Sequence, residues 1–231
     1  ARFLEGFEPL GLRGLSVTIP HKEAVRELMD AVDELSAGIG AVNTVLIHDG
    51  RRSGRNTDVA AALAAIANAA ERAGMKGLEG RKVLVVGAGG AGRAIAYGLV
   101  TRGADVTIAN RTVSRAEKLA VELGATACSL DRMVQVSPDI LVNATSIGMW
   151  PEVDETPVPC AMLRSGMVVF DSVYNPIETR LLKEADDAGC VTASGLEWFV
   201  KQAVAQFEWW TETEAPLGVM EQVVRSRLEE G

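Results

Sequence analysis

The sequence has few histidines and no closely spaced pair of cysteines, and these shortages argue against metal centres and disulfide or redox sites. Its 231 residues include only two histidines, His21 and His48, so a histidine-rich metal centre is excluded and no metal is expected. Cys128, Cys160 and Cys190 are odd in number, far apart and without a C-x-x-C spacing. We therefore interpret them as reduced structural thiols and expect a cytoplasmic protein.

The sequence also has few aromatic residues, an excess of negative charge and no long apolar run. Aromatic residues make up 5% of the chain, and the net charge at pH 7 is -8. An acidic chain lacks the electrostatic surface that nucleic acids or anionic membranes require, so neither is expected as a partner. A membrane-spanning helix would need about 18 consecutive apolar residues, and no such run occurs. Any anionic ligand must be held by local N–H groups and arginines.

A glycine-rich strand–turn–helix pattern is the clearest positive signal. Residues 83–86 are apolar and mostly β-branched, which is typical of a strand buried on both faces. Gly87, Gly89 and Gly92 follow with the spacing G-x-G-x-x-G, and residues 93–99 continue as an apolar helix. In a dinucleotide fingerprint the first glycine permits the turn, the second admits a pyrophosphate, and the third lets helix and strand pack. The pattern predicts a dinucleotide site, although such turns also occur without a nucleotide.

The residues after the next predicted strand indicate which dinucleotide binds. An Asp or Glu about 20 residues beyond the glycines would bind the ribose 2′-hydroxyl of NAD, and this chain has Asn110 there instead. Arg111 and Thr112 follow. A guanidinium binds a 2′-phosphate through paired charge-assisted hydrogen bonds, whereas a carboxylate would repel it. The sequence therefore predicts NADP as the cofactor, with Arg93 or Arg115 assisting Arg111.

Strands and helices alternate between residues 83 and 195, which predicts a parallel sheet with right-handed crossovers. Glycines at 77 and 195 are candidate hinges at the ends of this segment, and Asp49-Gly50 predicts a tight turn upstream of it. The predicted elements are the strands 15–19, 41–47, 83–86, 105–109, 140–144, 167–171 and 191–193, and the helices 21–32, 58–73, 93–99, 114–123, 179–188, 196–210 and 217–228.

Four polar residues upstream of the glycine pattern lie in or at the ends of predicted elements. Thr18 lies near the end of a strand, Lys22 and Asp58 begin helices, and Asn43 belongs to a strand. In open α/β sheets the carboxyl end of a strand faces the ligand crevice, so these are candidate site residues. The local context also allows simpler roles, namely a solvated first-turn lysine, an acidic N-cap and a hydrogen-bonding asparagine. Position alone does not decide between them.

Together these motifs resemble the shikimate dehydrogenase family, in the family's order and over nearly the whole chain. Within this family, the chain most resembles the C-terminal part of bifunctional dehydroquinate dehydratase–shikimate dehydrogenases. One expectation is therefore that a dehydroquinate dehydratase domain is fused upstream of it. The motifs are Ser-Val-Thr-Ile-Pro-His-Lys (16–22), Gly-Ala-Val-Asn-Thr (40–44), Asn-Thr-Asp (56–58), Gly-Ala-Gly-Gly-Ala-Gly (87–92), Asn-Arg-Thr (110–112), Asn-Ala-Thr-Ser-Ile-Gly-Met (143–149), Asp-Glu-Thr-Pro-Val-Pro (154–159), Val-Tyr-Asn-Pro (173–176), and Gly195 with Gln202.

The resemblance implies an α/β fold, with a Rossmann-type parallel-sheet NADP domain plus an incomplete α/β substrate-binding domain. It assigns residues 1–76 to the substrate-binding domain, 77–196 to the NADP-binding domain and 197–231 to helices that return to the substrate side. It further implies reversible hydride transfer between NADPH and the 3-keto group of 3-dehydroshikimate. The product would be shikimate, in the chorismate pathway of aromatic amino-acid biosynthesis. A monomer or a homodimer is expected.

The same resemblance implies roles for individual residues. Lys22 and Asp58 become the catalytic pair, because a carbonyl oxygen that receives a hydride needs a proton and a nearby positive charge. Which of the two carries the proton does not follow from the sequence. The implied substrate-binding residues are Thr18, Asn43, Tyr174 and Gln202, and the implied cofactor-binding residues are Gly87, Gly89, Gly90, Ala91, Gly92, Asn110, Arg111, Thr112, Thr145, Met149 and Gly195, with the nicotinamide near Met149 and Gly195.

The chain departs from the family pattern in two places. The family's N-terminal strand and its Ser-x-Ser segment, which binds the substrate carboxylate, are missing, so we expect either a fragment or an upstream element that completes the sheet. Trp198 stands where many relatives have methionine. Two other functions stay open, a quinate/shikimate dehydrogenase of broader specificity and a catalytically silent NADP-binding module.

Overall fold

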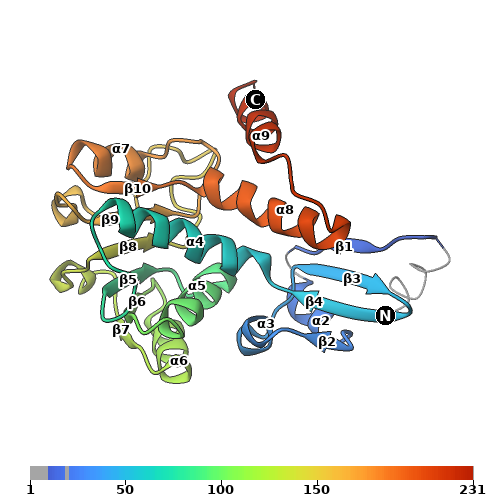
Figure 1. Cartoon of the computed structure of the whole chain (residues 1–231). Helices are drawn as coiled ribbons and strands as arrows, with labels where there is room; N and C mark the ends of the chain where they lie inside the picture. Colours follow the sequence, from blue (N-terminus) through green and yellow to red (C-terminus); the bar gives the residue numbers. More distant parts are fainter. Residues whose placement is uncertain (1–9, 19–20, 231) are drawn as a thin grey trace.

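The computed structural model describes residues 10–18 and 21–230, and within them the chain forms two β-sheets joined by long helices (Figure 1). The larger sheet has six strands and the smaller has four. Helices α4 (Thr57–Arg72) and α8 (Gly195–Thr211) pack against each other and run between the two sheets. The predicted strand at 15–19 falls partly outside the described residues.

The strands of the larger sheet are all parallel and have the order β10-β9-β8-β5-β6-β7. The order reverses beside β5, because the chain adds β6 and β7 on one side and then β8, β9 and β10 on the other. Ligand crevices in open α/β sheets lie at such a reversal, outside the carboxyl ends of the strands. The strands are β5 (Lys82–Val86), β6 (Asp105–Ala109), β7 (Thr126–Cys128), β8 (Ile140–Asn143), β9 (Val168–Asp171) and β10 (Val191–Ala193).

Strand β5 is buried on both faces, as its apolar run predicts. Val83 and Val85 belong to the core that the helices α4, α5 and α6 cover, whereas Leu84 and Val86 belong to the core on the opposite face, which α7 covers. Alternate side chains of one strand therefore serve two cores, which explains why the strand shows no polar alternation. The remaining helices of this part and of the C-terminus are α5 (Gly90–Val100), α6 (Val113–Leu123), α7 (Arg180–Asp187) and α9 (Leu217–Glu230).

The smaller sheet has the order β1-β3-β4-β2, with β3 antiparallel to β1 and β4 and with β2 parallel to β4. The predicted turn at Asp49-Gly50 is confirmed. Both residues have positive φ, 49° and 72°, and they join β3 to β4 as a two-residue hairpin. The elements here are β1 (Gly14–Ser16), α2 (Lys22–Arg26), β2 (Ala31–Val32), α3 (Glu34–Ile39), β3 (Thr44–His48) and β4 (Arg51–Arg55).

The helix predicted at 21–32 is wrong in length, because α2 ends at Arg26. The Asp30 carboxylate accepts hydrogen bonds from the backbone N–H and the guanidinium of Arg52, at 2.8 and 3.1 Å, and β2 then pairs with β4. These contacts hold the chain extended where its apolar periodicity favours a helix. Neither β4 nor α3 is predicted by the sequence pattern. The residues of β4 are largely polar, and they form a strand because β3 and β2 flank them.

Candidate active site

The first turn of α4 is anchored by its own cap and by two neighbouring segments. Asn56 is the N-cap, and its side-chain oxygen accepts a hydrogen bond from the backbone N–H of Val59 at 3.2 Å. The backbone N–H of Asn56 donates to Ser36 Oγ at 2.6 Å, and its Nδ2 donates to the carbonyl of Ala41 at 3.1 Å. Asp58 is therefore the second residue of the helix and not its cap, so its carboxylate is available to another partner.

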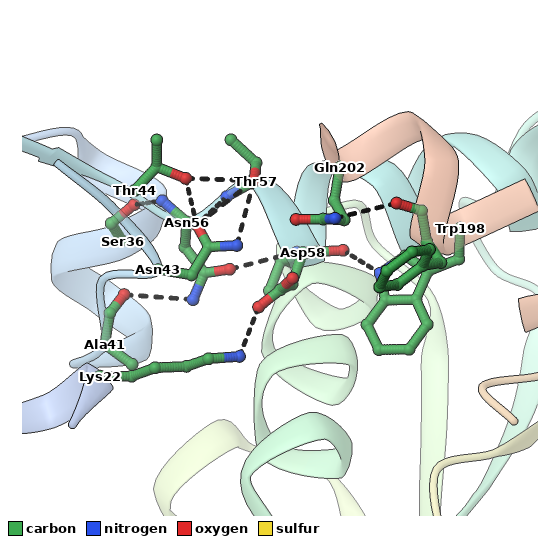
Figure 2. A network of polar contacts seen from close by, with 12 residues as sticks. Lys22, Ser36, Ala41, Asn43, Thr44, Asn56, Thr57, Asp58, Trp198 and Gln202 are labelled. Carbon is green, nitrogen blue, oxygen red and sulfur yellow. Dashed lines mark hydrogen bonds and ion pairs between the residues drawn. The ribbon is translucent and has the colours of Figure 1, made fainter. Parts of the chain in front are cut away.

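That partner is Lys22, the first residue of α2 (Figure 2). Lys22 Nζ lies 2.6 Å from Asp58 Oδ2, although the two residues are 36 positions apart. Their side chains are 28% and 19% exposed, so the ion pair is largely sheltered and still accessible to a small molecule. The first turn of a helix also favours a negative charge. An ammonium held in this way can donate a hydrogen bond or a proton to an oxygen that acquires charge.

Asn43, predicted to bind substrate, is 2% exposed, and its side chain positions the same helical turn. Its Oδ1 accepts hydrogen bonds from the Thr57 backbone N–H at 2.8 Å and from Thr44 Oγ1 at 2.7 Å. Its Nδ2 donates to Thr57 Oγ1 at 3.0 Å. The sequence alone allows Asn43 to form hydrogen bonds at the end of a strand, and the structure shows that it does so. Whether Asn43 also binds substrate stays a prediction.

The other three predicted substrate residues lie on the connection between β1 and α2 and on or against α8. Thr18 is exposed, and its carbonyl accepts a hydrogen bond from the backbone N–H of His21 at 2.9 Å. Tyr174 is 36% exposed and stacks on Phe199 of α8, with ring centroids 4.6 Å apart. Gln202 Nε2 donates to the carbonyl of Phe199 at 2.9 Å, and the side chain faces the first turn of α4 in Figure 2.

Trp198 contacts this site, although the sequence motifs assign it no role. Its indole N–H donates to the main-chain carbonyl of Asp58 at 2.7 Å, as Figure 2 shows. Its ring meets that of Phe170 in β9 edge to face, with centroids 6.4 Å apart. Trp198 therefore connects the Asp58 end of α4 both to α8 and to the larger sheet. A hydrogen bond between residues 140 positions apart leaves no local signal in the sequence.

The glycine turn after β5 has two positions that exclude a side chain and two that are open. Gly87 has φ +115°, and a Cβ there would lie 2.8 Å from a backbone oxygen of the β8 loop. A Cβ on Gly92 would lie 2.1 Å from the carbonyl oxygen of Gly87. Nothing lies within 4 Å of a Cβ on Gly89 or Gly90, and both are exposed together with Ala91. The open backbone at the start of α5 fits a pyrophosphate.

The residues after β6 form hydrogen bonds with the glycine turn and include an exposed arginine, Arg111. Asn110 Oδ1 accepts a hydrogen bond from the Ala88 backbone N–H at 3.2 Å, and Asn110 Nδ2 donates to the Thr112 carbonyl at 2.9 Å. Arg111 and Thr112 are exposed beside it. A cleft of about 230 Å³ adjoins the turn and is lined by Glu23, Ala88, Gly89, Gly90, Arg93, Arg115, Lys118, Leu119 and Glu122.

The two predicted assistants of Arg111 differ in their partners. Arg93 Nη1 lies 2.7 Å from the carboxylate of Glu122, so its charge is already compensated. Arg115 lines the same cleft from α6, and Lys118 lies beside it on that helix. The cationic groups here fit a phosphate at the mouth of the fingerprint turn. Arg115 is the better placed of the two assistants, because among residues 10–18 and 21–230 no carboxylate is paired with its guanidinium as Glu122 is with that of Arg93.

Thr145, Met149 and Gly195, the predicted nicotinamide residues, follow the carboxyl ends of β8 and β10. The backbone N–H and the hydroxyl of Thr145 both donate to Asn143 Oδ1, at 3.0 and 2.7 Å. Met149 is 44% exposed. Gly195 is buried, and a Cβ there would lie 2.3 Å from the carbonyl oxygen of Val173. The backbone after β10 therefore approaches the backbone after β9 closely at this edge of the sheet.

Asp171, at the end of β9, is a buried carboxylate in the same region. It is 0% exposed and accepts hydrogen bonds from Asn143 Nδ2 at 2.9 Å, Thr179 Oγ1 at 2.7 Å and the Val173 backbone N–H at 3.0 Å. Burial raises the pKa of Asp171 to about 6, although the three hydrogen bonds act in the opposite direction. The folded protein therefore holds this carboxylate against its desolvation cost.

Asp171→Asn is expected to remove a pH-dependent part of the folding stability. The pKa of about 6 in the folded protein lies above the ordinary 3.8, so the protonated acid stabilises the fold. That stabilisation is present below about pH 4 and is lost as the pH rises through about 6, a change of about 3 kcal/mol. Urea unfolding at several pH values should show the wild-type free energy of unfolding falling by this amount relative to the variant. A difference that does not change with pH would contradict this account.

Residues 10–18 and 21–230 contain no group of three or more His, Cys, Asp or Glu side chains that could hold a metal ion. No helix in this part of the chain is long and apolar enough to cross a membrane.

Family models match three stretches of the chain. The model described as shikimate / quinate 5-dehydrogenase matches residues 68–165. The model of the shikimate dehydrogenase substrate binding domain matches residues 1–45, and the model of the shikimate 5′-dehydrogenase C-terminal domain matches residues 195–225. These stretches include the fingerprint turn, Lys22 and the whole of α8.

The chain is also similar along nearly its whole length to curated proteins. It is 48% identical over 229 residues to the shikimate dehydrogenase (NADP(+)) of Natronomonas pharaonis, covering 97% of this chain and 83% of that protein. It is 44% identical over 227 residues to the chloroplastic bifunctional 3-dehydroquinate dehydratase/shikimate dehydrogenase of Arabidopsis thaliana. That match covers 93% of this chain and 38% of the Arabidopsis protein.

Solved structures of similar proteins share the fold. A shikimate dehydrogenase in complex with NADP+ is 37% identical with a TM-score of 0.89, covering 98% of this chain and 80% of that one. The Thermus thermophilus enzyme in complex with NADP(H) and shikimate is 36% identical with a TM-score of 0.82, covering 97% and 82%. A quinate dehydrogenase of Corynebacterium glutamicum in complex with NAD is 35% identical with a TM-score of 0.88, covering 97% and 82%.

Proposed function

The chain belongs to the shikimate dehydrogenase family, and we propose that it catalyses the reversible, NADP-dependent reduction of 3-dehydroshikimate to shikimate. It is an NADP-dependent oxidoreductase acting on a CH–OH group, with the Rossmann-type α/β fold of its relatives. The observation that supports the proposal at the level of residues is the 2.6 Å ion pair between Lys22 and Asp58. Trp198 connects the Asp58 end of α4 to β9, so the pair lies near the carboxyl edge of the parallel sheet.

In the proposed chemistry, Lys22 and Asp58 have different roles. When bound, the cofactor supplies or accepts the hydride. The oxygen of the keto group gains negative charge as the hydride arrives, and the Lys22 ammonium stabilises that charge and delivers a proton. Asp58 orients Lys22 and accepts a hydrogen bond from a substrate hydroxyl. Thr18, Asn43 and Gln202 bind the remaining hydroxyls together with Tyr174.

The proposed cofactor site extends along the carboxyl edge of the larger sheet. Residues 89–91 hold the pyrophosphate at the start of α5, with Gly87 and Gly92 shaping the turn. Asn110, Arg111 and Thr112 bind the adenosine end, with Arg111 on the 2′-phosphate, and Thr145, Met149 and Gly195 contact the nicotinamide. The proposed division of the chain follows from this, with the cofactor bound by residues 77–196 and the substrate bound between them and the segments 1–76 and 197–231.

Steady-state reduction of NADP+ by shikimate tests the proposal directly. The expected result is NADPH formation that requires both shikimate and the enzyme. Tight NADP+ binding by calorimetry without turnover would instead identify a silent NADP-binding module. Quinate is the second candidate substrate, because the matching family model covers both activities and a quinate dehydrogenase shares the fold with a TM-score of 0.88. Parallel assays with quinate in place of shikimate show which substrate the enzyme prefers. The same assays with NAD+ in place of NADP+ show which cofactor it prefers.

Arg111→Ala is expected to raise the KM for NADP+ about tenfold or more and to leave the KM for NAD+ nearly unchanged. A charge-assisted hydrogen bond contributes about 1.5–3 kcal/mol, and only NADP+ carries the 2′-phosphate that receives it. Arg102→Ala is the matched control, because Arg102 is also exposed but lies just beyond the opposite end of α5. An unchanged ratio of the two KM values would rule out Arg111 as the phosphate ligand.

We further infer a cytoplasmic location, supported by Cys128, Cys160 and Cys190, which are all free thiols. An upstream dehydroquinate dehydratase domain in the natural protein is supported by the similarity to the bifunctional Arabidopsis protein. A monomer or a homodimer is expected, and light scattering at working concentrations distinguishes the two.

A further inference from the structure

The carboxylate of Asp171 joins the segments that follow two neighbouring strands. Asn143 ends β8 and Asp171 ends β9, and Asn143 Nδ2 donates to Asp171 Oδ1 at 2.9 Å. The Val173 backbone N–H donates to the same oxygen at 3.0 Å. The other oxygen, Oδ2, accepts from the hydroxyl of Thr179 at 2.7 Å. Asp171, Asn143 and Thr179 are all 0% exposed, so water cannot replace any of these donors.

Through Asn143, this carboxylate determines the course of the loop after β8. Asn143 Oδ1 accepts from the Thr145 backbone N–H and hydroxyl, and Asn143 Nδ2 also donates to the Ile147 carbonyl at 3.3 Å. The Thr145 hydroxyl oxygen accepts in turn from the Ile147 backbone N–H at 3.1 Å. Because Asp171 accepts from Asn143 Nδ2, it holds the amide in the orientation that presents Oδ1 to Thr145.

Through Val173, the same carboxylate is connected to the first residue of α8. The Val173 backbone N–H bonds to Asp171, and the Val173 carbonyl lies so close to Gly195 that a Cβ there would be 2.3 Å away. Thr179, the third donor, is the N-cap of α7 and accepts from the Leu182 N–H at 3.3 Å. One buried carboxylate therefore connects the loop after β8, the loop after β9 and the first residue of α8.

We propose that Asp171 is a positioning residue for the nicotinamide half of the cofactor site, acting through Asn143 and Val173 on Thr145 and Gly195. The inference rests on the proposed function, which places the nicotinamide against Thr145, Met149 and Gly195. A carboxyl group suits this position because its two oxygens accept hydrogen bonds from all three donors. Among the described residues, no hydrogen bond of this network reaches the glycine turn or Arg111. The loop after β8 touches the turn only by packing at Gly87, so we expect the adenosine half of the site to depend on Asp171 much less than the nicotinamide half.

Asp171→Asn tests the proposal by a comparison of two ligands in calorimetry. NADP+ carries the nicotinamide, whereas adenosine 2′,5′-bisphosphate carries the 2′-phosphate without it. The variant places an amide donor where the Asp171 oxygen accepts the Thr179 hydroxyl proton. The Thr179 oxygen already accepts a hydrogen bond from the Leu182 N–H, so two donors then face each other there. We expect about a tenfold loss of affinity for NADP+, of the size of one charge-assisted hydrogen bond, and less than a twofold loss for the fragment.

Asp139→Asn is the matched control, because the Asp139 carboxylate also accepts a backbone N–H, that of Lys82 at 3.0 Å, but at the amino end of β8. It should bind both ligands as the wild type does. Thr179→Val and Thr179→Ser provide a second test if Asp171→Asn does not fold. Valine removes the hydroxyl donor and should weaken NADP+ selectively, and serine keeps the donor and should restore the affinity.

Equal losses for NADP+ and the fragment, or no loss for either, would overturn the inference, since a purely structural role affects both ligands alike. A wild-type protein that binds neither ligand would instead overturn the proposed function. If the wild type binds both ligands, and Asp171→Asn and Thr179→Val bind NADP+ and the fragment in the same ratio as the wild type, only the positioning role is overturned. The two failures are therefore distinguishable.

Discussion

Lys22→Met is expected to lower kcat for shikimate oxidation by about 100-fold to 10,000-fold, the range that general acid–base catalysis contributes. Methionine keeps the length of the side chain but removes the ammonium that lies 2.6 Å from the Asp58 carboxylate. The developing charge on the substrate oxygen then has no donor, and Asp58 has no counter-ion. The measurement is kcat and KM for shikimate at saturating NADP+, with NADP+ affinity by calorimetry as a check that the cofactor site is intact.

Lys183→Met is the matched control for this variant. Lys183 is also paired with a carboxylate, that of Glu178 at 3.7 Å, but its side chain is 61% exposed. Its replacement should leave kcat within about twofold, because exposed ion pairs contribute little. If Lys22→Met retained a rate within a few-fold of the wild type, the catalytic role assigned to Lys22 would be wrong.

Gly92→Ala is expected to reduce the free energy of unfolding by about 3 kcal/mol, the upper range for overpacking a close contact. The added Cβ would lie 2.1 Å from the carbonyl oxygen of Gly87, so β5 and α5 would have to separate. Gly89→Ala should behave differently. Nothing lies within 4 Å of its added Cβ, so the fold should keep its stability while the affinity for NADP+ falls, because the pyrophosphate needs that space.

Urea unfolding and NADP+ calorimetry on the two variants separate a packing glycine from a ligand glycine. Gly218→Ala, in α9 and with nothing within 4 Å of the added Cβ, controls for the effect of alanine in a helix. Wild-type stability in Gly92→Ala would contradict the close approach. Unchanged NADP+ affinity in Gly89→Ala would mean that the pyrophosphate does not pass over this turn.

Segments whose structure depends on near neighbours in the chain could be predicted. The apolar run of β5, the glycines after it and the helix that follows are neighbours in sequence and in space, and the structure has them as predicted. The hairpin at Asp49-Gly50 and the alanine-rich α4 follow the same rule. The short helix α3 and the polar strand β4 could not be predicted, because partners elsewhere in the chain create them.

The candidate site divides in a similar way. Glycine spacing and the residues at 110–112 indicate a dinucleotide and favour NADP by local chemistry alone, and the ordered set of motifs indicates the family. The roles of individual polar groups depend on contacts across the chain. Substrate binding by Asn43 stays a prediction from the family motif, whereas the hydrogen bonds of its amide with Thr57 and Thr44 are visible only in the structure. Asp171 carries no motif signal of its own, and only its burial and its three donors draw attention to it.

The sequence by itself determined the α/β class, the NADP preference and the family, because these rest on residue order, spacing and local conformational preference. Only the tertiary structure decided which distant side chains meet. Lys22 reaches Asp58 across 36 residues, Asn143 reaches Asp171 across 28, and Trp198 reaches Asp58 across 140. The energy of a hydrogen bond or an ion pair depends on distances of a few ångströms, and those distances are settled by how the helices and sheets pack.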